Sequence, residues 1–373
     1  MQAPVPRAGA AVAAALLAAL VLYASLYPFD DWRWPPGRTL AELLVLPWPR
    51  YQSPFDVWSN FLGYVPLGLL LALTARRPGG WNGWLLAVGA GAMLSCGAEV
   101  AQQFLPSRHP SLLDLALNSG GTLLGATLAP LLLRLGWPQR SARWLARWFD
   151  AGSAGAVLLL LLWPLALLFP APVALGLGQI GPRLLPLAAE LLEGVPWASD
   201  WHAALLAEGL PAAPLGVPAE ALITALGLLA PCLVAFAVVP PGWRRMGLAL
   251  GAAGLTAAVL TLSTALNFGP DHALTWLAPS TLPALVAGTA AALLLAWVPR
   301  RVAVGLGLVV VTALVMGVAQ APADPYFALS LQRWEQGRFI RFHGLAQWIG
   351  WLWPYGAGLW LLGRLGAPPT IQR

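Results

Sequence analysis

The chain has 373 residues, of which 58% are apolar and only 10% are charged, and its mean hydropathy is +0.70. A water-soluble domain of this length could not present so much apolar surface to solvent, so the composition excludes a soluble globular protein. Every basic residue is arginine, and the formal net charge is +6. Two cysteines, Cys96 and Cys232, are too few for a disulfide framework.

Apolar runs along the chain predict membrane spans, because a helix needs about 20 mostly apolar residues to cross a hydrocarbon core of about 30 Å. The first run is too long for a secretory signal, so we expect an uncleaved helix there. The sequence predicts an all-α fold, a polytopic transmembrane helix bundle of about ten spans. These spans are expected near residues 8–29, 56–74, 84–105, 112–133, 153–172, 219–240, 246–267, 281–298, 302–320 and 343–363.

The arginines predict the orientation of these spans. With the N-terminus in the cytoplasm, alternate connecting segments hold most of the arginines and a single acid, Asp150, which is the positive-inside pattern. We therefore expect both termini in the cytoplasm, in a multi-pass protein of the cytoplasmic (inner) membrane. The pI near 10.0 is then a consequence of topology, and no nucleic-acid partner is expected.

A stretch rich in Arg and Trp divides the chain. We expect a four-helix transmembrane domain over 1–133, a cytoplasmic linker over 134–152, and a six-span domain of unassigned role over 153–373. The linker is typical of an interfacial helix whose arginine side chains reach toward water or headgroups.

Polar residues inside spans are costly, so their positions are informative about function. They gather in the second to fourth spans, where each span carries a carboxylate and an amide four residues on, which places the two on one helix face. The candidate binding residues are Asp56 with Asn60, Glu99 with Gln103, Asp114 with Asn118, and Arg108 of the connecting loop.

The predicted topology puts all three pairs in the outer half of the membrane. Counting along the helices, Glu99 should lie about 9 Å deeper than Asp56 and Asp114. Close helix packing is predicted from two pairs of small residues four apart, Gly121 with Gly125 and Gly91 with Ser95, and a kink of the second span is predicted from Pro66 and Gly68.

Two segments resemble the VanZ-like membrane proteins. They read DVWSNFLGYVPLG over 56–68 and EVAQQFLPSRHPSLLDLALNSGGTLLG over 99–125. The shared pattern is an Asp and an Asn before Pro-x-Gly, then E-x-x-Q, a loop Arg, D-x-x-x-N and glycines, and the resemblance covers roughly residues 10–135. It implies a cell-envelope protein related to the accessory protein linked with resistance to the glycopeptide teicoplanin, an antibiotic.

Four interpretations of the polar residues remain open. They form packing hydrogen bonds between helices, or they bind a lipid-linked envelope molecule, with the three amides as hydrogen-bonding groups and Arg108 as the anion contact. Alternatively Glu99 is the general acid or base of an intramembrane enzyme with His109 as proton shuttle, or it carries protons in a transporter. Membrane lipids are the expected partners, no metal site is predicted, and the sequence does not identify a cofactor.

The second half contains a weaker candidate site. Asp271 and His272 lie in a short predicted outer loop and are too few for a metal site. The 326–343 segment resembles a helix in the outer interface, where arginines contact headgroups or form an anion clamp over the first site. Those arginines are Arg333, Arg338 and Arg341.

Overall fold

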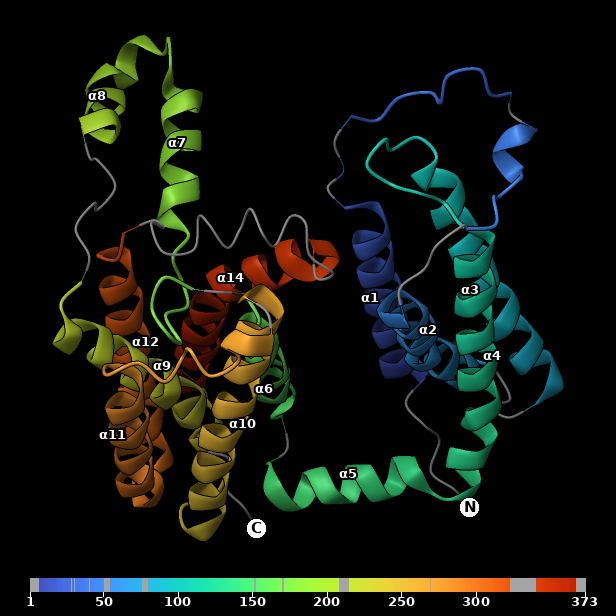
Figure 1. Ribbon diagram of the computed structural model, residues 1–373. Helices are drawn as coiled ribbons and strands as arrows, with labels where there is room; N and C mark the ends of the chain where they lie inside the picture. The colour runs from blue at the N-terminus through green and yellow to red at the C-terminus, as the bar shows by residue number, and fades with distance from the viewer. Residues whose placement is uncertain are drawn as a thin grey trace. The chain divides into compact units, whose positions relative to one another are not determined.

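The computed structural model describes residues 7–27, 29, 31–39, 41–49, 54–75, 80–150, 152–169, 171–207, 215–268, 270–322 and 340–366. These residues contain thirteen α-helices and no strand, which confirms the all-α fold (Figure 1). The chain divides into two compact units, Met1–Leu145 and Ala146–Arg373. The division falls inside the stretch rich in Arg and Trp.

A helix is present at each of the ten predicted spans, and among the described residues seven are long and apolar enough to cross a membrane. The seven are α1 (Arg7–Leu26), α2 (Pro54–Thr74), α3 (Trp81–Gln102), α4 (Leu112–Arg134), α9 (Val217–Phe236), α10 (Trp243–Phe268) and α12 (Arg300–Ala319). The remaining predicted spans correspond to α6 (Ala154–Ala166), to α11 (Thr281–Leu294) continued by η4 (Leu295–Trp297), and to α14 (Ile340–Leu365). The chain is therefore a multi-pass membrane protein.

Unit 1 is built around the contact between α2 and α4. A Cβ atom on Gly125 would overlap the carbonyl oxygen of Val65, and one on Gly121 would overlap that of Phe61. The two backbones thus touch, as the small-residue spacing predicts. α2 continues through Pro66 as one helix, and Gly68 is required for close approach to the backbone of Thr122.

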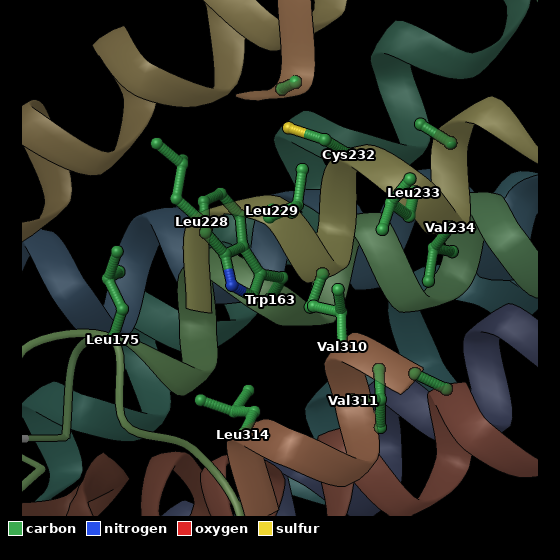
Figure 2. Close-up of a cluster of buried hydrophobic side chains, with 14 of the residues drawn as sticks. Trp163, Leu175, Leu228, Leu229, Cys232, Leu233, Val234, Val310, Val311 and Leu314 are labelled. Atoms are coloured by element: carbon green, nitrogen blue, oxygen red, sulfur yellow. The ribbon is translucent and has the colours of Figure 1, made fainter. Parts of the chain in front are cut away.

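Unit 2 packs around α9, whose C-terminal half is almost wholly buried. Its side chains meet those of α12 and the indole of Trp163 from α6, so these elements share one apolar cluster (Figure 2). Two short helices, α7 (Gly181–Leu192) and α8 (Ser199–Ala207), pack against each other, with η2 (Pro196–Ala198) between them in the chain (Figure 1). The cluster of Figure 2 contains no ionisable group apart from the Cys232 thiol.

A buried non-helical segment explains why α6 is short. After α6 the chain runs through residues 171–180 without helix, yet Leu175 is almost fully buried. Irregular backbone inside a membrane protein must find partners in the protein, because lipid offers none. Here Thr224 donates to the carbonyl of Ala174 at 3.0 Å and the Tyr355 hydroxyl donates to that of Gly178 at 3.1 Å.

One end of unit 2 is held together by a buried arginine. Arg245 is 0% exposed and donates to the carbonyls of Phe236 at 2.6 Å, Val239 at 3.0 Å and Val298 at 2.7 Å. These carbonyls lie where α9 and η4 end, so the guanidinium caps both ends.

Neighbouring contacts bring further helix ends to the same place. The side chains of Asp150 and Arg300 form an ion pair at 2.5 Å, and the Asp150 amide donates to Val238 at 3.1 Å. Segments that the positive-inside pattern assigns to one side of the membrane therefore meet at one end of unit 2.

Candidate functional site

The candidate site lies in unit 1 where α3 passes into α4. Its centre is a group of side chains from three helices, here called the polar cluster. The members come from α2, α3 and α4 in turn: Asn60 and Tyr64, Ser95 and Glu99, Asp114 and Asn118. The close packing of Gly121 and Gly125 on α2 sets the register, which puts Asn60 roughly level with Asn118.

The carboxylate of Glu99 is placed at the N-terminus of α4. It is 3% exposed and accepts a hydrogen bond from the main-chain amide of Ser111 at 2.7 Å. Ser111 is also the N-cap of α4, since its hydroxyl accepts from the amide of Asp114 at 3.3 Å. A main-chain donor at a helix N-terminus is a favourable environment for a negative charge.

This position corrects the predicted depth of Glu99. The carboxylate lies level with the N-cap of α4, one turn before Asp114, so it does not lie further along α4 than the aspartate. The reason is that the 103–111 connection folds back, so α4 begins beside the last turn of α3. Counting residues from the end of one helix could not predict this overlap.

The next turn of α4 continues the polar cluster. The Asn118 amide, on a side chain that is 5% exposed, donates to the hydroxyl of Ser95 at 2.9 Å. Its carbonyl oxygen Oδ1 is buried and has no hydrogen-bond partner. A buried polar atom without a partner is uncommon in folded proteins and destabilises the fold unless water or a ligand satisfies it.

Two side chains of α2 complete the cluster. Tyr64 is 4% exposed, and its hydroxyl lies near Ser95 and Glu99 without a hydrogen bond of normal geometry. One turn earlier, Nδ2 of Asn60 is buried and also without a partner. The polar cluster thus contains three unpartnered atoms, one hydroxyl, one amide nitrogen and one amide oxygen.

The predicted pairing of Glu99 with Gln103 does not occur. Gln103 is the C-cap residue that follows α3, and its side chain contacts Arg38 and the carbonyl of Leu43. Gln102 is the buried amide instead, and it donates to the carbonyl of Ser25 at 2.9 Å. The E-x-x-Q spacing, which joins Glu99 to Gln102, was the feature of the sequence that indicated Gln102.

The remaining predicted residues surround the cluster. Asp114 is buried in the first turn of α4, whereas Asp56 is half-buried near the start of α2. Arg108 donates to the carbonyl of Ala24 at the end of α1 at 3.2 Å, and His109 is exposed. Arg108 therefore ties the connecting loop to α1.

Residues 31–39 and 41–49, here called the cap, run across this end of unit 1. The amide of Arg33 donates to Phe104 at 2.9 Å, and that of Leu112 donates to Pro47 at 2.9 Å. In the turn before η1 (Glu42–Leu44), the amide and hydroxyl of Thr39 donate to Glu42 at 2.7 and 2.9 Å, which lowers the pKa of that carboxyl. The cap fixes the connection between α3 and α4 from outside the helices.

Sequence analysis did not identify Tyr64, Ser95, Gln102 and Ser111 as part of the site. Two of them follow the four-residue rule used for the others, since Tyr64 lies four after Asn60 and Ser95 four before Glu99. Ser111 precedes the apolar run of α4, where an N-cap is expected. The sequence therefore contained signals for these residues. They were missed because the prediction considered only pairs of a carboxylate and an amide.

The second-half candidates do not form a site with other described residues. Asp271 and His272 are exposed in the short helix η3 (Pro270–His272). Arg333, Arg338 and the side chain of Arg341 lie outside the described residues. Within the described part of the chain, no three His, Cys, Asp or Glu side chains come together to hold a metal ion.

Residues 10–133 match the VanZ/LLP1 family model. The match confirms the VanZ-like resemblance and contains α2, α3, α4 and the whole polar cluster. No curated protein and no solved structure matches the chain. The N-terminal unit of this membrane protein therefore contains a VanZ-like region.

Proposed function

We propose that the VanZ-like region binds the polar headgroup of a lipid-linked cell-envelope molecule from the outer half of the cytoplasmic membrane. One observation carries this proposal: the polar cluster holds three buried polar atoms without partners, on Asn60, Tyr64 and Asn118, and it also contains the buried carboxylate of Glu99, which lies near Tyr64. Packing alone gives no reason to bury them unsatisfied. A ligand bearing hydroxyl or amide groups would satisfy all three.

The charges around the cluster favour a headgroup with hydrogen-bonding groups over a bare phosphate. Glu99 and Asp114 are buried in the cluster, and two carboxylates repel an anion. Arg38 of the cap and Arg108 of the connecting loop carry guanidinium groups that are suited to a phosphate. The proposed ligand therefore places its hydroxyl or amide groups in the polar cluster and its phosphate toward the arginines.

The proposed orientation follows from the arginine distribution. Both termini and α5 (Trp137–Trp148) are assigned to the cytoplasm, and the cap to the opposite side. The contacts that join Asp150, Arg245 and Arg300 at one end of unit 2 support a shared side for those segments. A cysteine label introduced at Ala142 should be accessible only from the cytoplasmic side.

The enzymatic alternative receives less support. The contact of Glu99 with the amide of Ser111 is explained by its place at the N-terminus of α4 and assigns no catalytic role to the carboxylate. His109, the proposed proton shuttle, is exposed, and its pairing with Glu99 has no structural support. Effects on teicoplanin susceptibility would be a consequence of lipid binding.

The binding proposal is tested by Tyr64→Phe, which removes one unpartnered buried hydroxyl. If the cluster serves packing alone, losing a hydroxyl without a hydrogen bond should leave stability and lipid content unchanged or raise stability slightly. If it binds a headgroup, the melting temperature should hold while the lipid that co-purifies with the solubilised protein falls severalfold, as measured by mass spectrometry.

The matched control is Tyr355→Phe in unit 2. That hydroxyl donates to the carbonyl of Gly178 at 3.1 Å, so its removal should lower stability by about 0.6–2 kcal/mol without changing the bound lipid. Wild-type lipid content in Tyr64→Phe would overturn the proposed binding site.

A further inference from the structure

Helix α5, outside the VanZ-like region, has no buried residue along its 12 residues. Its side chains form two stripes, because 100° of rotation per residue brings Trp137, Trp144 and Trp148 within about 40° of arc. The arginines at 140, 143 and 147 fall within about 60° of arc, next to the tryptophan stripe. A segregated helix of this kind, with Trp on one face and Arg on the neighbouring one, is typical of a membrane surface.

The exposure of these side chains agrees with a helix that packs little against the protein. Trp137 and Trp144 are 58% and 56% exposed, and Arg140, Arg143 and Arg147 are all exposed. Trp148, at the end of α5, contacts the ring of Trp243 at 5.8 Å between centroids. Because Trp137 and Trp144 are more than half exposed, most of the tryptophan stripe is available to lipid.

Geometry restricts where α5 can lie. It follows the end of α4 after a turn at Gly136, whose φ is +65°, and it precedes α6 at Ala154. Twelve residues of helix are about 18 Å long, too short to cross about 30 Å of hydrocarbon. Both ends of α5 therefore lie on one side of the membrane, and the tryptophan stripe lies at the boundary between headgroups and acyl chains.

We propose that α5 is a binding surface for anionic phospholipid headgroups, with the tryptophan stripe inserted at that boundary and the arginine stripe on the phosphates. Charge complementarity identifies the occupant. The stretch from Arg134 to Phe149 contains four arginines and no acid, and guanidinium groups bind phosphate oxygens in pairs. This surface is separate from the polar cluster and does not depend on it.

Insertion is tested with spin labels on the full-length protein in phospholipid nanodiscs. Ser141→Cys lies on the tryptophan side of the helix and Ala146→Cys on the opposite side, so the two form a matched pair. The background carries Cys96→Ala, and absence of labelling there verifies that the buried Cys232 thiol does not react. The Ser141 label should collide mainly with oxygen and the Ala146 label mainly with a water-soluble nickel complex. Equal exposure of both labels to nickel would overturn the proposal.

Headgroup binding is tested by the triple variant Arg140→Gln, Arg143→Gln, Arg147→Gln. The ratio of phosphatidylglycerol to phosphatidylcholine retained by the full-length protein should fall, by up to about fivefold for each arginine removed. Arg301→Gln, an exposed arginine at the start of α12, is the control and should retain the wild-type ratio. An unchanged ratio in the triple variant would show that α5 does not select anionic lipid and would overturn the proposal.

Discussion

The two units bury polar side chains of different kinds. In unit 1 the described buried set includes two carboxylates and two amides: Glu99, Asp114, Gln102 and Asn118. In unit 2 it consists of hydroxyl groups and one arginine: Thr224, Thr256, Ser263, Ser280, Thr281 and Arg245. No acidic side chain is buried in the described part of unit 2.

The difference is also one of partners. Arg245 and Thr224 donate to main-chain carbonyls that would otherwise be unsatisfied, because helices end or break there. In the polar cluster, Tyr64, Asn60 and Asn118 lie within regular helices whose main chain already has partners, and each keeps an unpartnered atom. The described part of unit 2 has three such atoms, on Trp163, Thr256 and Arg300, but none of them accompanies a buried carboxylate.

Buried polar side chains therefore serve two purposes in this membrane protein. In unit 2 it satisfies the backbone, so substitutions should change stability. In unit 1 it exceeds what the backbone requires, so substitutions should change binding with less effect on stability. Variants in the two units should separate these two classes of effect.

The largest expected effect is that of Arg245→Met. The substitution keeps an unbranched apolar chain but leaves the carbonyls of Phe236, Val239 and Val298 without the guanidinium. Breaking a buried charged network typically lowers stability by about 3–5 kcal/mol. Thermal unfolding of the solubilised protein measures this loss. The neighbouring Arg244→Met, whose guanidinium only contacts a Trp ring, should change stability by less than about 1 kcal/mol.

A smaller loss is expected for Gly125→Ala in unit 1. The new methyl group would overlap the carbonyl of Val65, so α2 and α4 must separate, and overpacking of this kind lowers stability by about 1–3 kcal/mol. The control is Gly97→Ala on α3, where a Cβ meets nothing within 4 Å. If the two variants melt at the same temperature, the backbone contact between α2 and α4 is not what holds unit 1 together.

Much of the fold could be predicted from the sequence because lipid imposes strong constraints. Apolar runs located a helix at each of ten positions, and the spacing of Gly121 and Gly125 predicted the close contact of α4 with α2. The short α6 was not predicted, because the apolar residues after it continue into the buried non-helical segment at 171–180. Hydropathy cannot distinguish such a segment from helix, since both are buried and apolar.

The candidate site was predictable in part. Helical spacing selected Glu99 and Asn118, and the structure places both where α3 contacts α4. The same rule also selected Gln103, whose side chain instead contacts Arg38 and the carbonyl of Leu43. Interactions between distant segments, such as Ser111 with Glu99, depend on how the connecting loop folds, and no local pattern encodes them.

The smallest expected change in stability is that of Glu99→Gln, and this variant also separates the two classes most sharply. The amide keeps a carbonyl oxygen that can accept from the amide of Ser111, which in the wild type donates at 2.7 Å. The substitution removes the interaction of the charge with the N-terminus of α4, which is worth about 0.3–1 kcal/mol. The melting temperature of unit 1 should therefore stay near that of the wild type. If the carboxylate contacts a bound headgroup, lipid retention and any effect on teicoplanin susceptibility should nevertheless be lost.

Glu42→Gln in the cap provides the control, since that carboxylate is exposed and its partners belong to Thr39. Wild-type lipid retention by Glu99→Gln would mean that the buried carboxylate serves packing in unit 1, as Arg245 does in unit 2. The two units would then bury different polar groups for the same structural purpose.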